Sequence, residues 1–288
     1  MDIAIQIALN ALIAGAIYSL VVLGFNLLYS TSRFFDLGYG AIAIAGGYAV
    51  LYFYKLLGLE LWSSIILGIF IAGILGFCIE KIIYRPLRTR KASSAVLLIA
   101  SLGVLTVIQA VLAILFTSQF QTLGRGAGES RTFEIFGGAI TQTQSIILIT
   151  ALVVMTALGL VLKYTLFGKA VKAIADDEEV ASIVGINSER MIGIVFFIGS
   201  AIGGMAGIAT GFDTGLQPTI GLSLLLKGVI AAIVGGIGNV YGGVLGAFLL
   251  AIIENLGAWQ FSGEWKDAIA FIVLVVFLLF RPQGILPK

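Results

Sequence analysis

The residues best suited to chemistry in this chain are a few polar side chains within or beside long apolar runs. Asp36, Lys227 and Glu254 are ionisable, and Tyr39 and Asn239 lie beside glycine-rich breaks. A charge at the middle of a bilayer costs about 2.5–3.5 kcal/mol even on the lenient insertion scale. We therefore expect these side chains to face protein or water, and all five are candidates for the path of a transported solute.

Each candidate also has a purely structural interpretation. Glu254 can form a buried pair with Lys227 or contact the backbone, and Asp36 can cap a helix or pair with Arg33. For Glu254 the structural role is favoured over direct substrate binding. Tyr39 can line the path, where bulk would matter more than charge, or it can be a packing aromatic that faces lipid.

Other chemistry is excluded by residues that the chain lacks. It contains no histidine and a single cysteine, Cys78, so histidine-based catalysis, thiolate clusters and histidine-based metal sites are absent. No G-x-x-x-x-G-K-[ST] motif occurs, which excludes ATP binding by a P-loop. The net charge of +2, without a dense basic tract, argues against nucleic-acid binding. We expect no enzyme activity, no metal and no cofactor; an intramembrane enzyme is a disfavoured alternative.

The elements that must position the candidates are membrane helices. The 288 residues are 59% apolar and 11% charged, against roughly 25% charged in an average soluble chain, and the mean hydropathy is +1.10. Such a chain cannot coat itself with charge. The prediction is an all-α, polytopic transmembrane bundle of about 8–10 spans, some broken or re-entrant. Residues 1–288 then form a single transmembrane domain.

Apolar runs and their polar breaks place nine membrane pieces. One piece, Leu222–Val234, is too short to cross upright, and Gly235–Asn239 separates it from the next. Such a break indicates either a re-entrant helix or a tight loop between slanted spans, and both interpretations stay open. The nine predicted pieces are Ile3–Leu28, Leu37–Tyr54, Trp62–Tyr84, Ser94–Phe116, Ser145–Leu162, Met191–Gly211, Leu222–Val234, Val240–Leu256 and Ala268–Phe280.

Most of the 17 Lys and Arg residues fall on one side of this map, including the cluster Lys81–Lys91. The positive-inside rule makes that side cytoplasmic, with the amino end outside and the carboxyl end inside a plasma (inner) membrane. Helices with Gly at every fourth position, such as Gly199–Gly211, are predicted to pack closely.

The cytoplasmic segment at about 163–190 has its own pattern. A short basic helix with an apolar face at Val171, Ile174 and Ala175 precedes a second short helix, for which Asp176 is the predicted N-cap and Gly185 the end. A solvated loop is the simpler interpretation, but two capped helices favour a docking surface for a soluble partner. The candidate docking residues are Gly168, Lys169, Val171, Lys172, Ile174, Asp176, Asp177, Gly185 and Asn187.

Several motifs together resemble one family. The chain is similar to the membrane permeases of branched-chain amino acid ABC importers, and its length resembles the shorter, LivH-type subunit. Where the LivH pattern has N-F-A-H-G-E, this chain has Asp36–Ala41, without the His and Glu. The matching stretches are Gly15–Leu20, Asp36–Ala41, Glu80–Arg88, Gly168–Asn187, Gly235–Asn239 and Arg281–Leu286.

The resemblance implies a permease subunit that carries branched-chain or other hydrophobic amino acids. It implies a second permease subunit (the same chain or a different one), two cytoplasmic ATPases that dock on residues 163–190, and an extracytoplasmic binding protein. An alternative is a permease of this type for urea or another small solute. A self-sufficient secondary carrier or channel is a further alternative, which would not co-purify with an ATPase.

Overall fold

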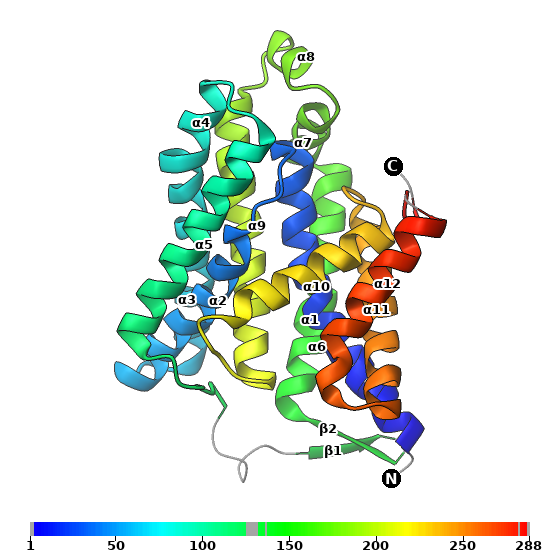
Figure 1. Ribbon diagram of the computed structural model, residues 1–288. Coiled ribbons are helices and arrows are strands. Elements are labelled where there is room, and N and C mark those ends of the chain that lie inside the picture. The colour runs from blue at the N-terminus through cyan, green and yellow to red at the C-terminus, as the bar shows by residue number, and fades with distance from the viewer. Residues whose placement is uncertain (1–2, 125–131, 136, 282, 287–288) are drawn as a thin grey trace.

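The computed structural model describes residues 3–124, 132–135, 137–281 and 283–286, and it is a bundle of helices (Figure 1). Arg125 and Arg131, two of the 17 Lys and Arg residues used to predict the orientation, lie outside the described residues, as do Pro282 and Lys288. The helices are α1 (Ile3–Ser32), α2 (Gly38–Leu51), α3 (Leu61–Ile79), α4 (Arg85–Thr89), α5 (Ser94–Phe116), α6 (Gln142–Tyr164), α7 (Leu166–Asp176), α8 (Glu178–Ile183), α9 (Ser188–Asp213), α10 (Ile220–Gly235), α11 (Val240–Gln260) and α12 (Lys266–Phe280).

Membrane-length helices form the bundle, as the apolar runs predict. Among the described residues, six helical stretches are long and apolar enough to cross a membrane, and one of them, Leu61–Thr89, runs from α3 through a π-helical turn into α4. Helices α2, α10 and α12 are shorter. The amino and carboxyl ends lie at opposite ends of the bundle in Figure 1, in agreement with the charge distribution.

Two of the short helices begin inside the bundle rather than at its surface. Helices α2 and α10 both start near mid-height in Figure 1, after non-helical segments that return from the ends of α1 and α9. Their first turns meet, because a Cβ at Gly40 or Gly221 would overlap the carbonyl group of the other residue. The predicted break after α10 is also present, with Gly236 and Gly238 at positive φ. Helix α10 therefore has the character of a broken helix.

The two halves of the bundle have the same packing pattern in opposite orientations. Helix α1 packs against α11 as α9 packs against α3, and α2 against α3 as α10 against α11. Helices α1 and α9 run in opposite directions and cross at the centre. This is the arrangement of an inverted-topology repeat, in which paired broken helices meet near the middle of the membrane.

The predicted close packing of glycine-rich faces is confirmed. A Cβ at Gly207 of α9 would overlap the carbonyl oxygen of Ala43 in α2, and one at Gly246 of α11 would overlap that of Ala231 in α10. By contrast, a Cβ at Gly103 of α5 would meet nothing within 4 Å. Glycine is therefore required where these helices cross, and it is dispensable on the outer face of α5.

A small sheet was not predicted. Strands β1 (Thr132–Ile135) and β2 (Gly138–Thr141) pair antiparallel in the outer loop, with Thr132 opposite Thr141. Thr141 then begins α6 with a capping box, in which its side chain and that of Gln144 satisfy each other's backbone N–H groups. The sheet is tied to α1, because Gln6 exchanges hydrogen bonds with the backbone of Ala139.

The cytoplasmic segment contains the two predicted helices, α7 and α8, at the end of the bundle with α4 (Figure 1). The predicted cap was wrong by one residue: Asp176 is the last residue of α7, and Asp177 caps α8 by accepting from the N–H groups of Glu179 and Val180. Helix α7 continues to Asp176 because its apolar face packs on the bundle. Gly185 has a φ of 89°, as suits the residue predicted to end α8, and Asn187 caps α9 by accepting from the N–H group of Arg190.

Candidate functional site

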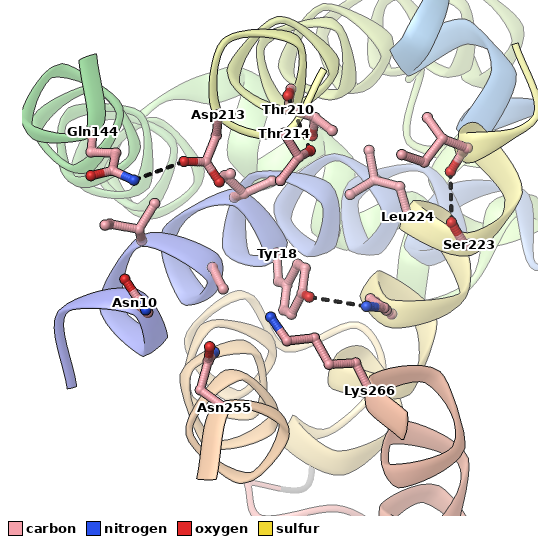
Figure 2. A pocket seen from close by; sticks show the side chains of 15 residues that line it. Asn10, Tyr18, Gln144, Thr210, Asp213, Thr214, Ser223, Leu224, Asn255 and Lys266 are labelled. Carbon is pink, nitrogen blue, oxygen red and sulfur yellow. Dashed lines mark hydrogen bonds between the residues drawn. The ribbon is translucent and has the colours of Figure 1, made fainter. Parts of the chain in front are cut away.

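A cavity of about 350 Å³, lined by polar and apolar side chains (Figure 2), lies in the half of the bundle that carries the start of α1 and the small sheet. We call it the outer cavity. Four polar side chains near helix ends line its outer part: Asn10 of α1, Gln144 of α6, Asp213 of α9 and Lys266 of α12. The cavity reaches Tyr18, midway along α1, and the first turn of α10. It therefore connects the outer end of the bundle with its centre.

Lys227 lines this cavity and belongs to an ion-pair cluster of three charged residues. Lys227 of α10 lies 3.6 Å from a carboxylate oxygen of Glu254 in α11 and 3.0 Å from one of Asp267 in α12. Tyr18 of α1 donates a 2.7 Å hydrogen bond to Glu254, whose side chain is fully buried. The predicted pairing of Lys227 with Glu254 is confirmed, and Asp267 and Tyr18 are further partners that were not predicted.

Two other charged residues of the outer cavity are less constrained. Asp213, at the end of α9, accepts a 3.0 Å hydrogen bond from Gln144, and Lys266 begins α12. Figure 2 shows Asp213 on one side of the cavity and Lys266 on the other, with Tyr18 between them. Among the described residues, neither side chain forms an ion pair. Ile13, Ile17 and Leu224 supply part of an apolar wall.

Asp36 and Tyr39 lie elsewhere, at the start of α2. Asp36 is buried and accepts a 2.6 Å hydrogen bond from Tyr84, whereas the expected partner Arg33 donates instead to the carbonyl oxygen of Ala175 in α7. Arg33 lies at the end of the bundle where α7 packs, and α7 offers a backbone acceptor there. Asp36 thus holds α2 to the end of α3, and its place in a transport path stays a prediction.

Tyr39 is 1% exposed and packs within the protein, so it does not face lipid. Its hydroxyl donates to the carbonyl oxygen of Val21 at 3.2 Å, and its ring fills the space left by Gly24 and Gly203. It lines neither the outer cavity nor the cytoplasmic cavity described next. The role of Tyr39 in the path remains a hypothesis that would require another conformation.

Asn239 caps α11 directly after the glycine-rich break. Its side chain accepts from the N–H groups of Tyr241 and Gly242, so these two N–H groups of the first turn are not free to bind a solute. Asn26 of α1 holds the break in place by bonding to Gly238 and Asn239. Asn239 also borders a cytoplasmic cavity of about 610 Å³ between α1, α6, α7 and α11.

The candidate docking residues fall on two different surfaces. Val171 and Ile174 are 4% and 3% exposed, because they hold α7 against the bundle. They do not present an apolar face to the cytoplasm in this structure. Ile183 and Val184, at the end of α8, are 81% and 70% exposed and were not predicted. The remaining candidates, Gly168, Lys169, Lys172, Asp176, Asp177, Gly185 and Asn187, lie in or between α7, α8 and the start of α9.

The residues that sequence reasoning missed are mostly charges assigned to loops. Asp213 and Lys266 stand at helix ends, where a charge has no special meaning until the fold places the ends together. Tyr18 lies in one of the quoted motifs but was not identified as a partner of Glu254. Within the described residues, no group of three or more His, Cys, Asp or Glu side chains is arranged to hold a metal ion.

Comparisons with known proteins match nearly the whole chain. A family model described as the permease component of the branched-chain amino acid transport system matches residues 7–278. The high-affinity branched-chain amino acid transport permease protein LivH of Escherichia coli K12 is 31% identical, over 99% of this chain and 96% of that protein. BraD of Pseudomonas aeruginosa is 31% identical with the same coverage, and LivH of Salmonella typhimurium is 30% identical.

A solved structure has the same fold. PsaBC from Streptococcus pneumoniae, determined in complex with Fab, is similar with a TM-score of 0.55 over 95% of this chain and 91% of that chain. The sequence identity is 13%, so this similarity concerns the arrangement of helices alone.

Proposed function

Because the chain belongs to the permease family of branched-chain amino acid transport systems, we propose that it is the membrane subunit through which an ABC importer passes branched-chain or other hydrophobic amino acids. The observation that carries this proposal is the match over nearly the whole chain. It includes all the membrane helices together with the cytoplasmic segment α7–α8.

The structure is consistent with a subunit that depends on partners for energy. The chain has no P-loop, so ATP must be hydrolysed by another polypeptide. The family implies ATPase and binding-protein partners. We propose two ATPases on the α7–α8 side, a second permease subunit in the membrane, and a binding protein that delivers the solute at the outer surface. Helix α8 and the residue after it present three exposed apolar side chains in the cytoplasmic segment, those of Val180, Ile183 and Val184.

The outer cavity favours an amino acid over urea. Its lining includes charges of both signs, Asp213 and Lys266, beside the aliphatic side chains of Ile13, Ile17 and Leu224. Urea is small and neutral and uses neither the charges nor the aliphatic wall. A branched-chain amino acid at neutral pH carries both charges and an aliphatic group.

Reconstitution tests the proposal directly. The permease, its ATPases and the binding protein are placed in liposomes, and uptake of radiolabelled L-leucine and urea is measured with and without internal ATP. We expect ATP-dependent uptake of leucine and none of urea. Leucine uptake by the permease without ATPases, driven by an ion gradient, would identify a secondary carrier. Uptake of urea alone would identify the other kind of permease.

A further inference from the structure

We propose that the outer cavity of this single subunit binds the charged groups of an amino acid, with Asp213 contacting the ammonium group and Lys266 the carboxylate. This inference rests on the proposed function and adds a site to it. The lining comes from α1, α6, α9, α10, α11 and α12 of one chain, so the site requires no residue of a second permease subunit.

The first argument is that these two charges form no ion pair, whereas the neighbouring Lys227 forms two. Lys227 already forms ion pairs with Glu254 and Asp267, so its charge is compensated within the protein. Among the described residues, Asp213 and Lys266 form no ion pair, although both side chains are half-buried. A partly buried charge is stabilised by a ligand of opposite sign. One anion and one cation in the same cavity match a zwitterion.

The second argument is the placement of the two charges. Figure 2 shows Asp213 and Lys266 on opposite sides of the cavity, separated by Tyr18. Gln144 donates to one carboxylate oxygen of Asp213 and so fixes its orientation while leaving the other oxygen available. The start of α10 borders the same space, and no side chain caps it. The positive end of that helix dipole adds to the attraction of the cavity for an anionic group.

The third argument concerns size and the apolar wall. A cavity of about 350 Å³ is at the lower end of the range of ligand pockets, about 300–1,000 Å³, which suits a small molecule. Part of its lining is purely aliphatic and consists of Ile13, Ile17, Ile220 and Leu224. They can contact an aliphatic side chain while the charged groups bind Asp213 and Lys266. The expected ligand class is thus the branched-chain amino acids.

Ligand analogues that lack one charge test each contact separately. The purified permease–ATPase complex, without binding protein, is titrated with L-leucine, with leucinamide, which lacks the carboxylate, and with 4-methylpentanoate, which lacks the ammonium group. We expect the wild-type complex to bind leucine about tenfold or more tightly than either analogue, which corresponds to about 1.4 kcal/mol or more.

The variants Asp213→Asn and Lys266→Gln then assign each charge. Asp213→Asn keeps an oxygen that can accept from Gln144, so it preserves the local structure. We expect it to weaken leucine about tenfold and to leave 4-methylpentanoate unchanged. Lys266→Gln should weaken leucine similarly and leave leucinamide unchanged. Glu264→Gln and Lys55→Gln remove exposed charges that do not line the cavity and should bind all three ligands like the wild type.

The outcomes separate this inference from the proposed function. If the reconstituted importer transports leucine but the wild-type complex does not distinguish the analogues, or both variants bind like the wild type, the site assignment is overturned and the function stands. If ATP-driven leucine uptake is absent, the proposed function itself fails.

Discussion

Tyr18 of α1 and Glu254 of α11 are joined by a hydrogen bond of 2.7 Å between residues 236 positions apart in the sequence. The glutamate side chain is fully buried, and its second contact is Lys227 at 3.6 Å. A buried carboxylate is stable only when hydrogen bonds and an opposite charge compensate its lost hydration. This cluster therefore ties together α1, α10 and α11 beside the outer cavity.

Removing the hydroxyl of Tyr18 should destabilise the protein. The Tyr18→Phe variant leaves Glu254 without its hydrogen-bond donor, at an expected cost of about 1–3 kcal/mol. Thermal unfolding in detergent, followed by intrinsic fluorescence, measures the difference. Tyr164→Phe, which changes a tyrosine that is 68% exposed on α6, is the matched control and should have little effect. Equal stability of the two variants would contradict the structural role of the bond.

Removing the cation of the cluster should cost more. Lys227→Met leaves the buried Glu254 carboxylate without its ion pair, and breaking such a pair typically costs about 3–5 kcal/mol. The double variant Lys227→Met with Glu254→Gln removes both charges and should recover much of that loss. The unfolding temperatures of the single and double variants show whether removing the second charge restores stability. If the double variant unfolds at a lower temperature than Lys227→Met alone, the Glu254 carboxylate is not stabilised by its ion pair with Lys227.

The crossing of α9 with α2 should not tolerate a methyl group. At Gly207 an added Cβ would overlap the carbonyl oxygen of Ala43, so Gly207→Ala is expected to cost about 1–3 kcal/mol through overpacking. At Gly103 the space is open, and Gly103→Ala should be neutral or slightly stabilising because alanine favours a helix by about 1 kcal/mol. The two variants are compared by their expression level and their unfolding temperature. Similar losses in both would argue against this helix crossing.

The two surfaces of the cytoplasmic segment should respond differently to charge. Ile183→Asp with Val184→Asp alters exposed residues, so the protein should remain stable while ATP hydrolysis and uptake become uncoupled. Val171→Asp with Ile174→Asp places carboxylates where α7 packs on the bundle, so it should lower stability itself. Unfolding temperature, ATPase activity and uptake are measured together. Normal coupling in the Ile183 and Val184 variant would remove α8 from the docking surface.

Accessibility should distinguish Tyr39 from the outer cavity. In a background with Cys78→Ala, a water-soluble thiol reagent is expected to label Ser223→Cys, which lines the outer cavity, and to leave Tyr39→Cys unlabelled in the conformation described here. Labelling of Tyr39→Cys during ATP turnover would show that Tyr39 enters the path in another conformation. Absence of labelling in every nucleotide state would place Tyr39 outside the path.

Much of the fold could be predicted from the sequence because apolar length and helix signals are local. The predicted Ser94–Phe116 coincides with α5, and Val240 begins α11 directly after the break, where Asn239 caps it. Strands β1 and β2 were missed, because four-residue strands in a glycine-rich loop carry little periodicity. The cap of α8 was displaced by one residue, since both Asp176 and Asp177 carry a suitable side chain.

The candidate site depended on contacts between distant segments. The pair of Glu254 and Lys227 was one of two contacts expected from the sequence, because few charges lie within apolar runs and each needs a partner in the membrane. Asp213 and Lys266 were left in loops, because a charge at a helix end is ordinary until α9 and α12 are placed around one cavity. For Val171 and Ile174 the apolar helix face was predicted correctly, but the sequence did not show that the membrane helices of the same chain cover this face.

The sequence by itself thus determined a helical membrane bundle and its family, because composition, apolar length and motifs are properties of the chain. It also predicts the orientation, through the charge pattern, and the need for another subunit to hydrolyse ATP. Only the tertiary structure decided that α2 and α10 begin inside the bundle, that Asp36 pairs with Tyr84 rather than Arg33, and that Asp213 and Lys266 share a cavity. The physical reason is that burial, pairing and cavities arise where helices meet, and helix periodicity is the same whichever neighbour a face will contact.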